Sequence, residues 1–221
     1  DYAAGVVYYS LCQDSAGMVW VGTNMGLFDY DGYKMHHRVA NVDNANTNIN
    51  CLIIRNDTIY AGADTGVLMY DIKAGKYLPH GIAFPSDVRS LAFDGNCLWI
   101  GSLKGLYKYD LITSDLRNMS QGLSHNAVYS VAVTRHGDLY IGTYNGLCRY
   151  DHVTGHVEKV DIDEPWRKGN LFVNVIADDP GRNCLWIGTE GALYCYKYSS
   201  GEVERVSQLG RQSIKSLDIS S

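Results

Sequence analysis

The stretch that decides the fold runs Trp99-Ile100-Gly101-Ser102-Leu103-Lys104-Gly105-Leu106-Tyr107-Lys108-Tyr109-Asp110. Close copies of it recur along the chain. Each copy begins with an aromatic residue, then one of Ile, Val and Ala, then a glycine and a small residue. Two variable residues, a second glycine, and Leu or Val follow. Two more variable residues and Tyr-Asp end the motif. These copies begin at Trp20, Tyr60, Tyr140 and Trp186. The chain is therefore a repeat protein, and its period is the first feature to interpret.

The repeats recur about every 40 residues, which is the length of one β-propeller blade. The fourth repeat shows how each repeat divides into strands and turns. Stretches rich in β-branched residues, in which apolar and polar side chains alternate, are separated by turn residues. They predict four short strands joined by hairpin-length connections. These strands are expected over residues 128–134, 139–143, 147–151 and 156–160. Four antiparallel strands per repeat are typical of a propeller blade.

Composition supports a globular protein and argues against several classes of function. The 221 residues are 46% hydrophobic, 11% aromatic and 19% charged, with no disorder signature. The formal charge of -5 and the scattered basic residues argue against non-specific nucleic-acid binding, which needs clustered Lys and Arg. No apolar run approaches the ~18 residues of a membrane span, and no signal peptide is recognisable.

The six cysteines are far apart and form no CxxC pair, so they do not resemble a metal site. Cys97 and Cys184 occupy the same position of the repeat, just before Leu-Trp, where a small buried residue suits a strand. We expect buried free thiols, with a disulfide as the alternative in an oxidising compartment.

The chemistry of the motif explains its recurrence. The second glycine supplies the positive φ that a tight hairpin requires. The aspartate that ends the motif begins the next turn, where its carboxylate can accept backbone N–H groups. The large rings are expected to fill the wedge between adjacent blades. The residues are Gly26, Gly66, Gly105 and Gly146 for the hairpins, Asp31, Asp71, Asp110 and Asp151 for the turns, and Trp20, Trp99 and Trp186 for the wedges.

The first strands of the repeats also align, with a small residue at the third place that suits crowding near a propeller axis. In the fifth repeat we align Phe172-Val173-Asn174-Val175 with Val128-Tyr129-Ser130-Val131. The prediction is an all-β chain: one partial β-propeller over residues 1–221, with five complete four-stranded antiparallel blades and the first strand of a sixth. We expect it to be a fragment of a seven-bladed propeller. The blades are expected over residues 6–40, 48–80, 87–118, 127–160 and 171–206, and the sixth begins over 213–219.

Two kinds of loop share one face of a propeller: the turns between the second and third strands, and the connections between blades. Polar and aromatic side chains there can hydrogen-bond hydroxyls and stack on rings, so they are the candidate ligand-binding residues. For any one of them a structural or solvated role is the commoner outcome. The turns supply Asn24, Asp64, Lys104, Tyr144, Asn145 and Glu190, the connections supply His125, Trp166 and Arg167, and the inner strands supply Arg89, Tyr129 and Lys215.

The longest connection, residues 161–170, carries Trp166 beside Arg167. An exposed aromatic face flanked by cations is a platform for a sugar ring or a base. The alternative is that Trp166 packs as a plug over the core.

Catalysis is poorly supported by the sequence. The pair His152 and His156 flanks a predicted tight turn without a neighbouring Cys or carboxylate set to complete a metal shell. Nothing sets two carboxylates across a cleft, as glycoside hydrolysis requires. Neither GxGxxG nor GxSxG occurs. We expect no catalytic residue, metal or cofactor in this segment.

The repeat Trp-Ile-Gly-Thr/Ser-x-x-Gly-Leu-x-x-Tyr-Asp, preceded by a Ser-Leu or Ser-Val strand and a Gly-x-Leu-Trp turn, resembles the two-component regulator propeller repeat. The resemblance extends from about Val6 to Leu217. Repeat two departs from it with Tyr60-Ala61-Gly62-Ala63, and repeat five has its turn glycine at Gly191, with Ala192 in the usual place.

This resemblance implies the periplasmic sensor region of a Bacteroidetes-type hybrid two-component system anchored in the inner membrane. Such proteins are associated with sensing oligosaccharides and signalling to a histidine kinase elsewhere in the parent chain. The implied partners are an oligosaccharide or other small molecule, the remaining blades and the downstream sensor domains, and a homodimer through the parent is possible. No nucleic acid is expected.

Two alternatives stay open. One is a propeller enzyme, either a polysaccharide lyase or hydrolase or a quinone-dependent dehydrogenase. The turns Tyr70–Gly75 and Tyr150–Gly155 faintly resemble those of quinone enzymes, but the tryptophan-docking repeats of that class are missing. The other is a pure scaffold propeller whose ligand is held by another domain.

Overall fold

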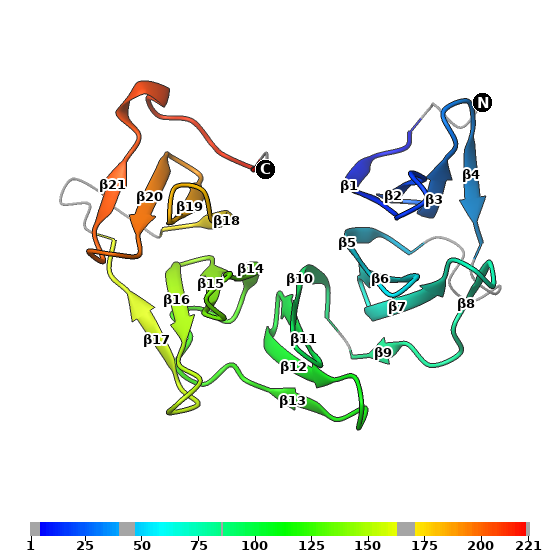
Figure 1. The fold of residues 1–221 in the computed structure, drawn as a ribbon, viewed down its shortest axis with the longest axis horizontal. Helices are drawn as coiled ribbons and strands as arrows, with labels where there is room; N and C mark the ends of the chain where they lie inside the picture. Colours follow the sequence, from blue (N-terminus) through cyan, green and yellow to red (C-terminus); the bar gives the residue numbers. More distant parts are fainter. Residues whose placement is uncertain (1–4, 40–46, 85, 163–170, 220–221) are drawn as a thin grey trace. The chain divides into compact units, whose positions relative to one another are not determined.

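The computed structural model describes residues 5–39, 47–84, 86–162 and 171–219. These residues form an all-β structure with a single short 3-10 helix at Ser207–Leu209. The chain divides into an N-terminal unit, residues 1–91, and a C-terminal unit, residues 92–221. Strand β10 crosses from one unit to the next, and each unit is described by itself (Figure 1).

The N-terminal unit contains the first two blades, whose strands follow chain order within each sheet. In blade two the outermost strand is interrupted, because β8 and β9 each pair a different part of β7. Blade one consists of β1 (Tyr8–Gln13), β2 (Val19–Thr23), β3 (Gly26–Tyr30) and β4 (Met35–Arg38), and blade two of β5 (Ile49–Arg55), β6 (Thr58–Ala63), β7 (Gly66–Asp71), β8 (Lys76–Tyr77) and β9 (Ile82–Ala83).

The C-terminal unit holds the sheets of blades three, four and five, again antiparallel meanders in chain order (Figure 1). The strands of blade four begin and end within one residue of the sequence prediction. Blade three consists of β10 (Val88–Asp94), β11 (Cys97–Ser102), β12 (Gly105–Asp110) and β13 (Leu116–Asn118); blade four of β14 (Val128–Val133), β15 (Leu139–Thr143), β16 (Gly146–Tyr150) and β17 (Val157–Val160); and blade five of β18 (Val173–Asp179), β19 (Cys184–Thr189), β20 (Leu193–Lys197) and β21 (Val203–Arg205).

The hairpin between the second and third strands has two loop residues in blades one to four, closed by pairs such as Thr143 with Gly146. The glycine has positive φ in all four blades, for example +117° at Gly146, as predicted. In blades one, three and four a Thr or Ser hydroxyl also holds the turn, as where the Thr143 hydroxyl donates to Gly146 O and accepts from Asn145 N–H. In blade five Ala192 replaces the glycine, and β20 begins one residue later, at Leu193.

The first glycine of the motif has a role that the sequence analysis did not identify. A Cβ built on Gly22 would lie 2.7 Å from Ile49 O, and one on Gly62 would lie 2.6 Å from Val88 Cγ1. Both contacts join one blade of the N-terminal unit to the inner strand that follows it. Real Cβ atoms do not approach so closely, so only glycine lets these strands pack. The C-terminal unit repeats the contact at Gly101, Gly142 and Gly188.

The motif aromatics fill wedges between blades, as predicted for two of the three tryptophans. Trp20 is 3% exposed and its ring centroid lies 5.4 Å from that of Tyr70 in the next blade. Trp99 is fully buried, 4.9 Å from Tyr150. Trp186 in blade five is half-buried. Each indole N–H donates to an aspartate: Trp20 to Asp14, Trp99 to Asp94 and Trp186 to Asp179.

The aspartates after the third strands cap turns as expected. Asp151 Oδ1 accepts the backbone N–H groups of Val153 and Thr154, and Gly155, with φ +72°, closes the turn. These N–H donors, Val153 foremost, lower the pKa of the Asp151 carboxyl. Asp31 and Asp110 repeat the arrangement with their own turn N–H groups.

One alignment was wrong by a residue. Val173, not Phe172, begins the inner strand of blade five, because Val173 pairs with Thr189 as Val128 pairs with Thr143. Val175 then faces Gly188. The tight contact of Val173 with Gly142 fixes this register, and a preference for a small residue at the third place could not reveal it.

No strand is assigned over 213–219, where the first strand of a sixth blade was expected. Ile214 still occupies the corresponding position. A Cβ on Gly188 would lie 2.7 Å from Ile214 Cγ2, and the Ile214 N–H donates to Thr189 O at 2.8 Å. Ile214 therefore lies against blade five as the first residues of the other inner strands lie against the blades before them.

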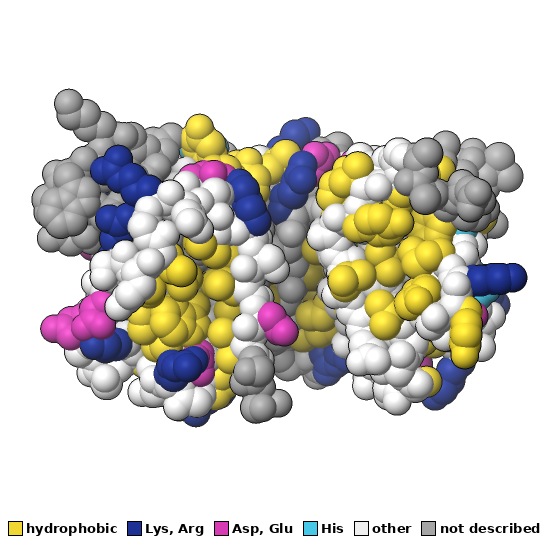
Figure 2. All heavy atoms as spheres, turned by 90° about the horizontal axis from the view of Figure 1, so that it is seen from above, with side chains coloured by type: hydrophobic (Ala, Val, Ile, Leu, Met, Phe, Trp, Pro, Cys, Tyr) yellow, Lys and Arg dark blue, Asp and Glu magenta, His cyan; other side chains and the backbone are white. Residues whose placement is uncertain are grey.

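The inner strand of blade one is exposed in a way that the other inner strands are not. Tyr8 is 57% and Leu11 68% exposed, whereas Ile49, at the position of Tyr8, is fully buried. Hydrophobic side chains gather on this part of the N-terminal unit in the space-filling view (Figure 2).

Candidate functional site

An aromatic row lies in the C-terminal unit and consists of His125, Tyr144, Phe172 and Tyr129. Ring centroids are 5.2 Å apart for His125 and Tyr144, 5.3 Å for Tyr144 and Phe172, and 4.4 Å for Phe172 and Tyr129. The rings are tilted by 48–57° to one another. His125 is exposed, and Tyr144 is 40% exposed. The row brings together residues of the consecutive blades four and five.

The backbone explains why these rings meet. Tyr144 lies in the β15–β16 hairpin turn, and its N–H donates to Ala127 O at 2.9 Å, which ties the turn to the connection before β14. The pairing of β14 with β15 shifts between Val128 and Ser130, so Tyr129 lies at a bulge. Bulges redirect a side chain out of the ladder, which places Tyr129 beside the loops.

His125 is held in one tautomer. Its Nδ1 accepts the Ala127 N–H at 3.0 Å, so in the neutral ring the proton is on Nε2. The row therefore offers one N–H donor and two phenol hydroxyls next to three aromatic faces, a mixture that suits a ligand with an apolar face and hydroxyl edges.

A charged pair flanks the row. Lys215 Nζ lies 5.8 Å from the centroid of Phe172 and forms an ion pair with Glu190, in the β19–β20 turn. Lys215 foremost, then Ser213 and Asn174, lower the pKa of the Glu190 carboxyl. Asn174 Nδ2 also donates to Ile214 O at 3.0 Å. Residues 214 and 215 are thus joined to the inner strand of blade five and to its β19–β20 turn.

The predicted residues of the N-terminal unit are engaged in structural contacts. Asn24 Oδ1 accepts the Val7 N–H at 2.8 Å, and its Nδ2 donates to Gly5 O. Asp64 accepts from Asn48 Nδ2 at 2.6 Å and from Asn50 Nδ2 at 3.3 Å. These contacts explain the two polar side chains without a ligand.

Arg89, also in this unit, pairs with Asp87 at 3.0 Å while both side chains stay about one-third exposed (35%). Its Nε is buried without a hydrogen-bond partner among the described residues.

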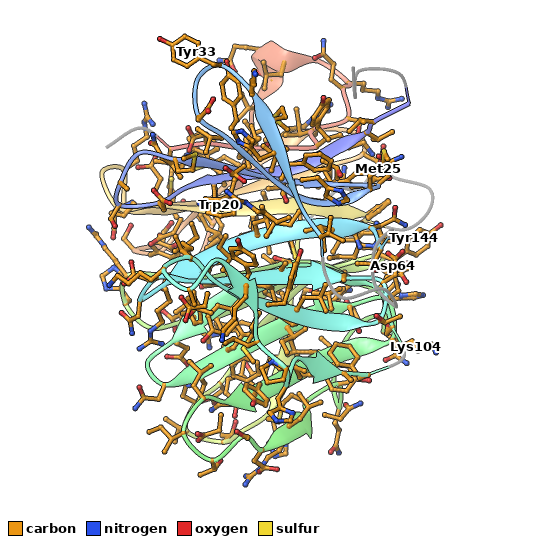
Figure 3. The ribbon with its side chains drawn as sticks, turned by 90° about the vertical axis from the view of Figure 1, so that its right-hand side faces the viewer. Trp20, Met25, Tyr33, Asp64, Lys104 and Tyr144 are labelled. Carbon is orange, nitrogen blue, oxygen red and sulfur yellow. The ribbon has the colours of Figure 1, made fainter. Side chains whose placement is uncertain are left out.

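The other predicted residues divide by exposure. Lys104 and Asn145 are exposed at the hairpin tips of blades three and four. Lys104 and Tyr144 project from the same edge of the C-terminal unit, while Asp64 and Met25 lie at one edge of the N-terminal unit (Figure 3). Trp166 and Arg167 lie outside the described residues.

Sequence reasoning missed Phe172 and Asn174 as site residues. Phe172 was assigned to the inner strand, where its ring would have been core, and only the one-residue shift moves it into the row. Asn174 was assigned to the crowded third place. With the corrected register Asn174 lies at the second place of its inner strand, the position by which Tyr129 and Lys215 are selected.

Among the described residues no group of three or more His, Cys, Asp and Glu side chains is arranged to hold a metal ion. The described part of the chain also contains no helix long and apolar enough to span a membrane. What the row can do chemically is stack rings and exchange hydrogen bonds.

The family model for the two-component regulator propeller matches residues 1–25 and 122–145. Among solved structures, the extracellular domain of BT4673 from B. thetaiotaomicron, named as a hybrid two-component system, is 40% identical with a TM-score of 0.86. The alignment covers 92% of this chain and 28% of that chain. A second structure of the same domain, named there as a one-component system, is 38% identical over 96% of this chain. No curated protein matches the chain significantly.

More distant structures share the fold alone. Virginiamycin B lyase from Staphylococcus aureus is 14% identical with a TM-score of 0.73, covering 93% of this chain and 71% of that chain. The chain spans less than a third of the BT4673 domain. The chain is thus similar to two-component regulator propellers at the two matched stretches, and to the extracellular domains of Bacteroides two-component systems over most of its length.

Proposed function

We propose that this chain is a non-catalytic, ligand-binding segment of a periplasmic two-component sensor, and that it recognises an oligosaccharide. The observation that carries the proposal is the aromatic row, with Tyr144 and His125 exposed at its outer end. The 40% identity to an extracellular domain of a hybrid two-component system supports the same location and role. The parent would be anchored in the inner membrane and signal to a histidine kinase elsewhere in its chain.

The physical argument is that a pyranose ring has an apolar face of C–H groups and an edge of hydroxyls. Tyr144 and His125 offer ring faces, and the Nε2–H of His125 and the amide of Asn145 offer hydrogen bonds at the rim. Such a site binds without needing charge. Binding would signal by favouring one arrangement of the parent over another, which requires a tighter affinity for that arrangement.

Calorimetry of the chain, and of the longer parent, against a panel of neutral and acidic oligosaccharides tests the proposal. Tyr144→Ala should weaken binding of a sugar that the wild type binds by roughly 3- to 10-fold, the value of one aromatic contact. Tyr33→Ala is the matched control, since Tyr33 is 92% exposed at a turn of the other unit. No binding across the panel, or equal loss in both variants, would reject the site.

The enzyme alternative rests on the propeller fold shared with the lyases at 14–15% identity. Chromatography of each oligosaccharide after prolonged incubation with the chain distinguishes it, since cleaved product would contradict the non-catalytic proposal. The scaffold alternative predicts that the parent binds the sugar with unchanged affinity when Tyr144 is replaced.

A further inference from the structure

Two thiols of blade five meet on adjacent strands. Cys184 begins β19 and Cys195 lies within β20, and all six cysteines of the chain are free thiols in the structure. The Cys195 side chain interacts with that of Cys184 and adds to the burial that raises the pKa of the Cys184 thiol. Cys184 is 1% exposed, and Cys195 is half-buried. The other cysteines have different neighbours: Cys148, for example, contacts Ser124, and Cys51 lies against Gly62.

The register of the hairpin favours this approach. Trp186 pairs with Cys195 and Cys184 with Lys197, so the two cysteines are diagonal neighbours on one face of the sheet. The Lys197 N–H donates to Glu202 O, away from β19, and backbone direction alternates along a strand. Both pairs are therefore non-hydrogen-bonded pairs of β19 and β20, and the two cysteines are diagonal neighbours, one from each pair.

We propose that Cys184 and Cys195 form a cross-strand disulfide when the chain folds in an oxidising compartment. The oxidant is a low-molecular-weight or protein disulfide. The thiolate of one cysteine attacks a sulfur of that disulfide and releases one thiol; the second thiolate then attacks the mixed disulfide and releases the other. Two protein thiols lose their protons and two electrons, and one oxidant disulfide becomes two thiols.

The burial of Cys184 determines when the disulfide can form. Burial raises the pKa of the Cys184 thiol to about 12, so the folded protein holds almost none of its reactive thiolate near neutral pH. The bond therefore forms readily during folding, while Cys184 is accessible, and slowly once blade five is complete.

The bond would constrain one specific element. The segment between the two cysteines is the β19–β20 hairpin, whose turn carries Glu190, the partner of Lys215. A disulfide between β19 and β20 holds the two strands of this hairpin together. It also removes conformational freedom from the unfolded chain, so the oxidised form should be more resistant to denaturant.

The test is a mass-spectrometric comparison of the chain refolded with oxidised glutathione and with a reductant, each alkylated in denaturant. Trypsin should release residues 183–197 as one peptide with both cysteines, because no Lys or Arg lies between them. In the oxidised sample this peptide should be two hydrogen masses lighter and unalkylated. Cleavage after Glu190 should leave its halves joined until reduction.

Two cysteine variants distinguish this disulfide from other pairings. Cys195→Ser should abolish the mass loss and leave Cys184 alkylated, whereas Cys148→Ser should leave the linked peptide intact. The oxidised wild type should also unfold at a higher denaturant concentration than the reduced form, and this difference should vanish in Cys195→Ser. Alkylation of both thiols after oxidative refolding, or linkage of either to another cysteine, would overturn the proposal.

Discussion

Gly101 and Val128 meet so closely that a Cβ on the glycine would lie 2.7 Å from Val128 Cγ1. The contact joins the second strand of blade three to the start of the inner strand of blade four. Since the other blades repeat it, the glycine is where one blade approaches the next.

Gly101→Ala should therefore destabilise the chain. The added methyl group must displace a fully buried valine, and overpacking of this kind costs about 1–3 kcal/mol of unfolding free energy. Urea denaturation measures it. Gly191→Ala is the matched control: Gly191 has open space around its Cβ position and no positive φ, so its change should stay within about 0.5 kcal/mol. Equal effects of the two substitutions would contradict the packing role of Gly101.

Trp99 and Trp186, the motif tryptophans of the C-terminal unit, should differ in their contribution to stability. Trp99 is fully buried against Tyr150, and Trp99→Ala should cost about 3–5 kcal/mol. Trp186 is half-buried, so Trp186→Ala should cost clearly less despite losing the hydrogen bond to Asp179. Chemical denaturation followed by circular dichroism compares them, and a larger loss for Trp186 would be inconsistent with the wedge role of Trp99.

Asp179 should make stability pH-dependent at the acidic end. Hydrogen bonds from Trp186 foremost, and from Arg182, lower the pKa of its carboxyl from 3.8 to about 2. Because the folded-state pKa is the lower one, the stabilisation is complete above the unfolded value and is lost as pH falls from about 4 to about 2.

Denaturation midpoints across this range should fall more steeply for wild type than for Asp179→Asn, which has no carboxylate to protonate. Asp115→Asn, at an exposed pair with Arg117, is the control and should keep the wild-type slope. Parallel curves for wild type and Asp179→Asn would exclude this role for the carboxylate.

The pair of Glu190 and Lys215 should contribute little to overall stability. Their side chains are 43% and 65% exposed, and exposed pairs contribute about 0–1 kcal/mol that salt screens. Its effect should instead be local: Glu190→Gln should speed hydrogen exchange at the Ile214 amide, which donates to Thr189 O. Glu204→Gln, which removes an exposed pair with Lys197, should leave that amide unchanged. Unaltered exchange in Glu190→Gln would show that backbone contacts alone hold residues 213–215.

The sequence alone determined the fold class, because the signals for a propeller blade are local and repeated. Hairpin glycines such as Gly146, capping aspartates such as Asp151 and the alternation of β14 act within a few residues of themselves. Each of these signals is weak alone, but their regular recurrence along the chain identifies the length of the repeat. The same patterns identified the loops that carry Tyr144 and His125.

Only the tertiary structure decided the register of blade five and the composition of the site. Phe172 enters the aromatic row because Val173 packs on Gly142, some thirty positions earlier, and that contact leaves no trace in the local pattern. Asn24 and Asp64 look like surface ligands in sequence but satisfy backbone and amide groups that only folding brings near. Cys184 and Cys195 meet because of strand register. Side-chain pairing across blades and strands is non-local, and the physical cause of each pairing is packing that the linear pattern does not encode.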